Sequence, residues 1–335
     1  MKQIRAISRI ILLSVLWIIL IGAFAWAFGA LWYDFPIAGI RRLVAIAFFI
    51  GGIATVIFIR PRWKGMAGIA VAIVPVVAWW LTLKPSNTRD WQPDVAQAAW
   101  AEINGDIVVL HNVRNCEYRT EKDYTVKWET RTFDLSKLTG LDIGIDYWGS
   151  PYMAHPMLSF QFEDALPVVM SIETRKEKGE FYSAIGGLYR QYELIYLATD
   201  ERDAFRVRTN YRKDEQIYLY RTAFTPAQAR VRFMEYISTI NSLSGMPRWY
   251  NAITTNCTTA IRSQHDASKR APFDWRMLVN GFMDEMLYEK GGFATDNLAF
   301  PELKKRALIN PAAQAADQSP DFSRLIREDR PGFGK

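Results

Sequence analysis

The apolar residues of this 335-residue chain are concentrated at its beginning. Residues 10–32 contain no charged side chain, and these 23 residues exceed the roughly 20 that cross a hydrocarbon core of about 30 Å. Two further uncharged runs follow, and only the short basic turn 60–65 separates them. The pattern predicts a membrane anchor over residues 1–85, with three transmembrane helices at about 10–32, 43–59 and 66–83.

The orientation of this anchor follows from its basic residues, because cytoplasmic flanks hold an excess of Lys and Arg. Three basic residues precede the first run and three lie in the turn 60–65, whereas Arg41, Arg42, Lys84 and Arg89 lie on the opposite side. The majority predicts a cytoplasmic N-terminus and a C-terminal domain outside the cytoplasm. Arg41 and Arg42 leave open whether the second segment crosses fully. A cleaved signal peptide also begins with basic residues, but the first run is longer than such signals have.

After the polar segment 84–90, the pattern changes to short β-branched and aromatic runs divided by turn residues, followed by helical spacing. This predicts one α+β domain over residues 90–310 and an irregular tail over 311–335. The expected strands are 106–110, 125–133, 157–162, 168–174, 193–198, 205–209 and 216–220. The expected helices begin at Pro226 after a Thr225 cap, at Asn256, and near Phe273 with an end at Gly291.

The sequence pI of about 9.2 suggests a nucleic-acid or anionic partner until the charge is divided by region. Residues 1–89 hold ten of the 41 Lys and Arg residues but one of the 35 acidic residues. The rest of the chain therefore has 31 basic and 34 acidic residues. Because the basic excess belongs to the anchor, we expect no nucleic-acid partner.

Metal and cofactor chemistry has little support in the sequence. The chain has two cysteines and three histidines, and neither C-x-x-C nor H-E-x-x-H occurs. We therefore expect no metal and no cofactor.

Cys257 is the main candidate for chemistry. It follows Asn256, a strong helix N-cap residue, so it would occupy the first position of a helix. There the helix dipole lowers the pKa of a thiol, and unpaired backbone N–H groups can hold an oxyanion. A small buried cysteine that packs under a helix end fits the same pattern equally well.

A thiolate nucleophile commonly needs a base, and the three histidines differ in position. His265 is eight residues along the same helix, roughly 12 Å from Cys257 and out of reach. His111 follows a strand and suits a structural role, whereas His155 leads a strand. If residue 162 pairs with 168 in a hairpin, Glu173 lies diagonally across from His155 on the same face and can orient its ring. A solvated Glu173 paired with a nearby basic residue is the alternative.

Several segments resemble one bacterial family, that of the Lnb N-terminal periplasmic domain, whose named enzyme is a lipoprotein N-acyltransferase. The similar segments are Asn112–Arg119, Ala154–Phe160, Ser171–Glu180, Tyr192–Tyr196, Asp200–Asp203 and Tyr250–Thr259. The resemblance implies a papain-like, permuted NlpC/P60-type thiol fold in the periplasm, anchored in the bacterial inner membrane. His155 and Cys257 match its catalytic pair, and Glu173 falls where a third polar residue is expected.

Two departures from the family limit what can be carried over. Position 116 is more often aromatic in the family, so Cys116 receives no functional role. The named enzyme also has its membrane segments after the domain, whereas here they precede it, so its lipoprotein substrate does not transfer directly.

Three functions remain open at this level. The first is a cysteine-dependent acyltransferase with a membrane lipid as donor and a lipoprotein N-terminus as acceptor. The second uses the same Cys–His dyad in a cell-wall peptidase or amidase. The third is a non-catalytic envelope binding module in which Cys116 and Cys257 form a disulfide.

Overall fold

The computed structural model describes residues 2–264, 272, 274–277 and 279–334, which form two compact units. The helical unit comprises Met1–Pro85 and Tyr182–Tyr192, and the sheet unit comprises Ser86–Phe181 and Glu193–Lys335. Each unit is built around its own core, and each is described by itself below.

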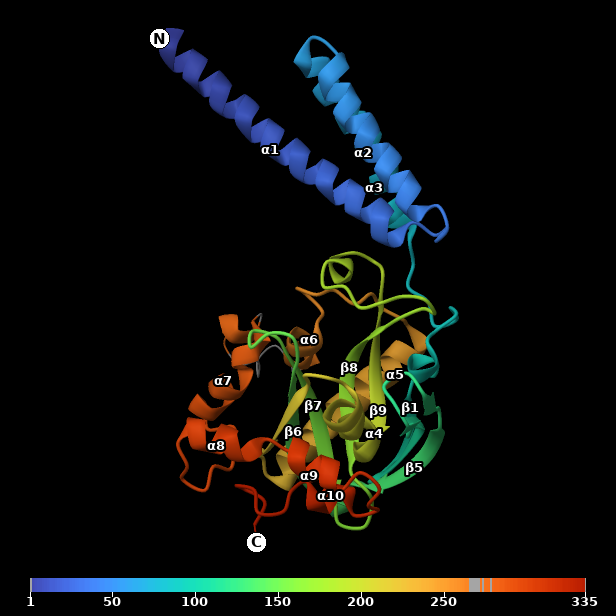
Figure 1. Ribbon diagram of the computed structural model, residues 1–335, viewed down its shortest axis with the longest axis vertical. Coiled ribbons are helices and arrows are strands. Elements are labelled where there is room, and N and C mark those ends of the chain that lie inside the picture. Colours follow the sequence, from blue (N-terminus) through green and yellow to red (C-terminus); the bar gives the residue numbers. More distant parts are fainter. Residues whose placement is uncertain (1, 265–271, 273, 278, 335) are drawn as a thin grey trace. The chain divides into compact units, whose positions relative to one another are not determined.

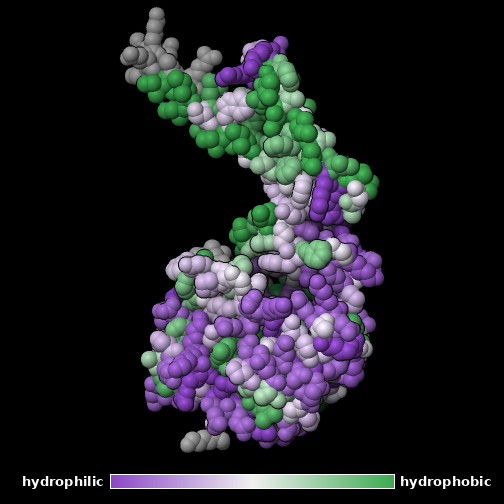
Figure 2. Space-filling model, in the orientation of Figure 1, coloured by the Kyte–Doolittle hydropathy of each residue, from purple (hydrophilic) through white to green (hydrophobic). Residues whose placement is uncertain are grey.

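The helical unit contains α1 (Lys2–Asp34), α2 (Arg41–Phe58) and α3 (Arg62–Thr82). All three are long and apolar enough to cross a membrane, over stretches of 25, 18 and 21 residues. Hydrophobic residues cover their outer surface in Figure 2, as expected for helices whose solvent is lipid. Gly65 of α3 lets the backbones of α2 and α3 approach, because an added Cβ there would lie 3.2 Å from the Thr55 carbonyl oxygen.

The sheet unit is built on a mixed eight-stranded sheet (Figure 1). The strand order is β1-β2-β9-β8-β7-β6-β10, with β5 also paired to β2. Only β2 and β9 pair in parallel, and the other pairs are antiparallel. The strands are β1 (Trp100–Asn104), β2 (Ile107–Arg114), β5 (Trp128–Asp134), β6 (Leu138–Tyr147), β7 (Ala154–Phe162), β8 (Val168–Arg175), β9 (Glu193–Asp200) and β10 (Gln216–Arg221). A small separate sheet pairs β3 (Glu117–Tyr118) with β4 (Tyr124–Thr125).

Each face of the central sheet has its own helical cover. On one face, α5 (Pro226–Gly245) packs Phe233 and Tyr236 against aromatic residues of β7 and β9. On the other face, α4 (Glu201–Arg206), α9 (Asn310–Ala315) and α10 (Phe322–Leu325) form a core with Met157 and Val169. The π-helical turn η4 (Val207–Tyr211) adjoins α4 and contacts α9. The polar residues of the candidate site lie on this second face.

The start of α5 confirms the predicted cap, because Thr225 and Gln228 form a complete capping box. α6 (Cys257–Gln264) begins where the sequence places it. The helix expected near Phe273 is shorter than predicted: 3₁₀ turns at Trp275–Met277 (η6) and Asn280–Phe282 (η7) precede α7 (Met283–Glu289). α8 (Phe300–Ala307) follows.

Two of the expected segment types are wrong, and both errors concern residues that pack on the second face. The segment 205–209 is helical instead of a strand, because Asp200 caps α4 by accepting a hydrogen bond from the Arg202 backbone N–H. The tail 311–335 is not irregular: Phe322 and Ile326, one helical turn apart, are buried in the core. Strands β1 and β6 were not predicted at all.

Candidate active site

Strands β7 and β8 bring His155, Ser171 and Glu173 together on one face of the sheet. The observed register pairs Met157 with Ser171 and Phe160 with Val168, two residues away from the predicted hairpin register. A shift of two preserves which side chains share a face, whereas a shift of one would reverse it. Glu173 therefore lies across from His155, closer than the diagonal position that the sequence predicts.

Hydrogen bonds assign the proton on the His155 ring. Nε2 lies 2.8 Å from the Ser171 hydroxyl oxygen and 3.0 Å from Glu173 Oε1. The Ser171 hydroxyl donates its only proton to Glu173 Oε1, at 2.7 Å, so towards His155 it can only accept. Nε2 must then carry the ring proton, which makes Nδ1 the basic nitrogen of the neutral imidazole.

Glu173 remains ionised in this environment. Its Oε1 atom accepts from His155, from Ser171 and from Arg208 Nη2, the last at 3.1 Å. Burial alone would raise the pKa of Glu173, but the attraction of His155 and Arg208 and the Ser171 hydrogen bond outweigh burial and hold the pKa well below its usual range. A fixed negative charge beside Nε2 orients the ring and stabilises an imidazolium if one forms.

A second carboxyl group, that of Asp146, lies beside the cluster and contacts Arg208. Asp146 of β6 pairs with His155 across the strands, and its Oδ2 lies 3.1 Å from Arg208 Nε. Burial, with a further contribution from Glu215, raises the pKa of Asp146 to about 8, although Arg208 and His155 oppose the shift. Folding therefore shifts the pKa values of the two carboxyl groups that contact Arg208 in opposite directions, lowering that of Glu173 and raising that of Asp146.

Three members of this cluster were missed by sequence reasoning. Ser171 could have been found, because it lies two residues before Glu173 and alternation puts both on one face. Arg208 was hidden by the mistaken strand at 205–209, since it reaches the cluster from the π-helical turn η4. Asp146 was hidden because β6 was not predicted.

Helix α6 packs against both strands that carry this cluster, and against α5. Asn256 caps it: its side-chain oxygen accepts hydrogen bonds from the backbone N–H groups of Thr258 and Thr259, at 3.0 and 2.8 Å. Cys257 is the first residue of the helix, as predicted, while its side chain and the whole of His265 lie outside the described residues. The backbone thus places Cys257 at the start of a helix that contacts both of these strands.

The turn before β7 is held in place by Asn280 and Gly281, which are distant from it in the sequence. Asn280 accepts a hydrogen bond from the backbone N–H of Ala154, the residue before His155, at 2.9 Å. Gly281 fits here because a side chain would collide with the Pro151 carbonyl oxygen, 2.1 Å from the position of an added Cβ. These contacts fix the backbone from which the His155 side chain projects.

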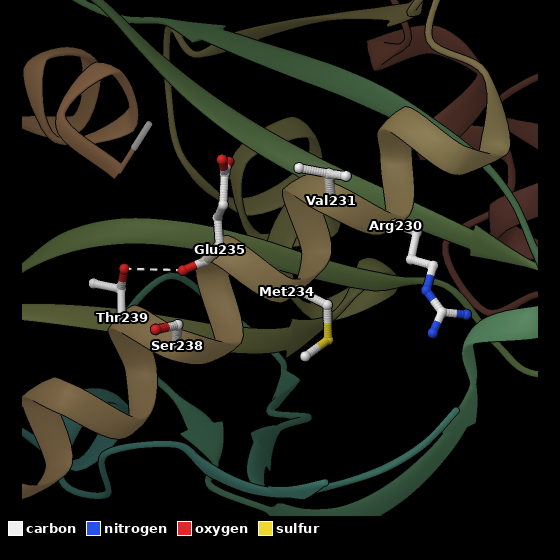
Figure 3. A pocket seen from close by; sticks show the side chains of 6 residues that line it. All are labelled: Arg230, Val231, Met234, Glu235, Ser238 and Thr239. Atoms are coloured by element: carbon white, nitrogen blue, oxygen red, sulfur yellow. Dashed lines mark hydrogen bonds between the residues drawn. The ribbon is translucent and has the colours of Figure 1, made fainter. Parts of the chain in front are cut away.

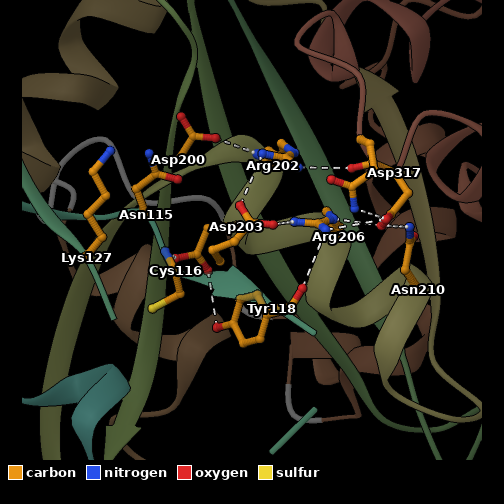
Figure 4. Close-up of polar contacts among 12 residues, drawn as sticks. Asn115, Cys116, Tyr118, Lys127, Asp200, Arg202, Asp203, Arg206, Asn210 and Asp317 are labelled. Atoms are coloured by element: carbon orange, nitrogen blue, oxygen red, sulfur yellow. Dashed lines mark hydrogen bonds and ion pairs between the residues drawn. The ribbon is translucent and has the colours of Figure 1, made fainter. Parts of the chain in front are cut away.

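The other cysteine lies in a separate cluster (Figure 4). Cys116 carries a free, buried thiol, so the disulfide required by the binding-module hypothesis is not formed. Its backbone N–H donates to Asp203 Oδ2 at 2.7 Å, and Asp203 forms a two-point ion pair with Arg114. Burial, followed by the nearby Asp203 carboxylate, raises the pKa of the Cys116 thiol to about 12.

A surface hollow and the possibility of a metal site remain to be compared with the His155 cluster. A surface hollow of about 440 Å³ is lined by residues of α5 alone, as Figure 3 shows, and its acidic residue Glu235 is paired with Arg232 at 2.7 Å. Among the residues that the structure describes, no group of three His, Cys, Asp or Glu side chains could hold a metal ion. Neither feature offers a chemistry that competes with the His155 cluster.

Comparison with known proteins confirms the resemblance noted in the sequence. The family model of the Lnb N-terminal periplasmic domain matches residues 124–281, which include His155, Glu173 and Cys257. No curated protein and no solved structure matches the chain. Together with the three apolar helices, the match describes a membrane-anchored protein with a periplasmic domain. Residues 124–281 thus match the Lnb N-terminal periplasmic domain family, the family that the sequence resembles.

Proposed function

We propose that this protein is a cysteine-dependent acyl-transfer enzyme in which His155 activates Cys257. The observation that carries the proposal is the hydrogen-bonded set His155–Ser171–Glu173 on the two strands against which the helix led by Cys257 packs. A nucleophile at a helix start, a histidine base and a carboxylate that orients the base are the parts that covalent acyl transfer requires.

Each residue has a defined part in the reaction. His155 Nδ1 takes the thiol proton, and the Cys257 thiolate attacks the carbonyl carbon of an acyl ester. The ester C–O bond breaks, His155 returns the proton to the leaving alkoxide, and the acyl group remains on sulfur as a thioester. An acceptor amine then attacks the thioester, loses its proton to His155, and releases the thiolate.

The Glu173 carboxylate and the start of α6 assist this sequence. Glu173 acts as a positioning residue, since it touches His155 and not the reacting atoms. The backbone N–H groups at the start of α6 can bind the negative oxygen of the tetrahedral intermediate. The order of His155 before Cys257 also suits the papain-like, permuted NlpC/P60-type fold, which we include in the proposal.

A lipid is the donor that best suits a protein anchored by three membrane-spanning helices, with a lipoprotein N-terminus as acceptor. We place the anchor in the bacterial inner membrane with a cytoplasmic N-terminus. Arg41 and Arg42, which conflict with this orientation, have local partners: Arg41 donates to the Phe35 carbonyl oxygen at 2.9 Å, and the Arg42 guanidinium lies 5.7 Å from the centre of the Trp32 ring. These contacts are those of residues at the end of a helical hairpin, where interfacial Arg and Trp are common.

The direct test is mass spectrometry of the intact full-length protein after incubation with membrane phospholipids. We expect one acyl adduct on Cys257, absent from Cys257→Ala and His155→Ala and present in the matched control Cys116→Ala. Glu173→Gln should slow adduct formation by roughly a hundredfold, because the ring loses its charged orienting partner. Transfer of an acyl group from phospholipid to an acceptor without any adduct on Cys257 would refute the proposal. Cleavage of cell-wall peptides in place of acyl transfer would favour the peptidase.

A further inference from the structure

The segment Tyr182–Tyr192, which joins β8 to β9, belongs to the helical unit although its neighbours in the chain belong to the sheet unit. The Tyr189 ring stacks on Tyr33 of α1, with ring centres 5.4 Å apart. Gly29 of α1 makes room for it, because an added Cβ would lie 1.9 Å from the Tyr189 hydroxyl oxygen. This close fit holds the segment against the C-terminal part of α1.

Arg190 joins the same segment to the ends of two helices. Its backbone N–H donates to the carboxylate of Asp34, the last residue of α1, at 3.1 Å. Its Nη1 atom donates to the carbonyl oxygens of Trp80 and Leu83, at 2.5 and 3.0 Å, which belong to the end of α3. The Trp80 carbonyl oxygen also accepts from the Leu83 backbone N–H at 3.3 Å, so Arg190 adds a charged donor to carbonyl groups at the end of α3. The guanidinium also lies 3.7 Å from the centre of the Trp80 ring.

By length and composition, the candidate membrane-spanning stretches of α1 and α3 end at Asp34 and Thr82. A segment packed on both ends is therefore at the level where a lipid–water interface is expected. Residues of this level include Trp32, Tyr33, Trp79 and Trp80, types that are enriched at membrane interfaces.

The large exposed side chains of the segment Tyr182–Leu188 are hydrophobic. Tyr182, Ile185 and Leu188 are 47, 59 and 41% exposed, and no charged residue occurs from 182 to 189. In the link between α1 and α2, at the same helix ends, Ile37 and Ile40 are exposed as well. Exposed apolar side chains continuous with membrane-spanning helices are expected to contact lipid.

We propose that Tyr182–Leu188 is a membrane-surface segment whose Tyr182, Ile185 and Leu188 side chains insert between the lipids of the leaflet on that side. The partner is the bilayer itself, and the inference is independent of the catalytic proposal. In the chain, the segment lies between β8, which carries Ser171 and Glu173, and β9, which begins at Glu193.

The test measures depth in the bilayer with a spin label on the full-length protein in phospholipid vesicles. Cysteine replaces Ile185 in a Cys257→Ala background, since the buried Cys116 thiol is not labelled. The matched control places the label at Val231, which is 58% exposed on α5. The ratio of collisions with oxygen, which partitions into lipid, to collisions with a water-soluble nickel complex should be about tenfold higher at 185.

Two results would overturn the inference. A ratio at 185 equal to that at 231 would place the segment in water, and few collisions with either reagent would mean that protein covers it. A second variant tests the attachment: Arg190→Ala should lower the ratio at 185 towards the control value, whereas Arg119→Ala, which removes an exposed arginine of the sheet unit, should leave it unchanged. An unchanged ratio in Arg190→Ala would contradict the role given to Arg190.

Discussion

The His155 cluster and the Cys116 cluster both hold a carboxylate against an arginine inside the sheet unit, yet only one of them suits proton transfer. In the Cys116 cluster, Asp203 is fully buried and engaged by Arg114 and by a backbone N–H, and the neighbouring thiol has its pKa raised to about 12. In the His155 cluster, an imidazole lies between an anionic Glu173 and an Asp146 whose pKa is about 8. Similar parts are therefore inert in one place and able to exchange protons near neutral pH in the other.

The largest contrast should appear in thiol reactivity. A pKa of about 12 leaves Cys116 with roughly a thousandfold less thiolate at pH 7 than an ordinary thiol of pKa about 8.5. Burial reduces its alkylation further, whereas a thiol at a helix start gains reactivity. We expect iodoacetamide to modify Cys257 at least a thousandfold faster than Cys116 in the folded protein, as measured by peptide mass spectrometry. Rates within tenfold of each other would remove the contrast between the two sites.

The Cys116 cluster, which has the less reactive thiol, should contribute strongly to the stability of the fold. Asp203→Ala removes the close, two-point partner of the Arg114 guanidinium, which is 7% exposed, and leaves the more distant Asp94 carboxylate at 3.9 Å; the loss should cost about 3–5 kcal/mol. For a domain of this size the thermal midpoint would fall by on the order of 10 °C. Asp123→Ala, which removes the exposed partner of Arg119, is the matched control and should change little. The thermal midpoints of both variants are measured in one detergent. A small change of the midpoint in Asp203→Ala would show that Arg114 finds another partner.

The sequence predicts the membrane-spanning helices, several element boundaries and the shared face of His155 and Glu173. The apolar runs, the Thr225 cap and the start of α6 at Cys257 are local signals, and each was found. The face shared by His155 and Glu173 also emerged despite a wrong register, because alternation survives a shift of two residues.

What escaped prediction depends on contacts between distant parts of the chain. Arg208 enters the cluster from a π-helical turn that its own segment does not signal. Phe322 and Ile326 complete the core from a tail that looks irregular in composition, and the docking of 182–192 on α1 and α3 has no local pattern at all. Such features follow from tertiary packing and ion pairing, which outweigh local propensity.

The smallest predicted effect concerns the pH dependence of stability within the His155 cluster. Because the pKa of Asp146 is about 8 in the folded protein and about 3.9 in the unfolded chain, folding retains a proton. That contribution to stability is complete below pH 4 and is lost as the pH rises through 8. Asp146→Asn keeps an acceptor for Arg208 but removes the titration, so it should gain stability relative to wild type between pH 5 and pH 9.

Glu173→Gln should give the opposite profile, because the pKa of Glu173 is lowered by folding instead of raised. Its carboxylate contributes stability above the ordinary glutamate pKa, and that contribution is lost as the pH falls through the lower folded value. The deficit of Glu173→Gln should therefore be complete at neutral pH and should shrink in acid. Denaturant midpoints from pH 4 to pH 9 measure both variants, and profiles parallel to wild type would show that folding shifts the pKa of neither carboxyl group.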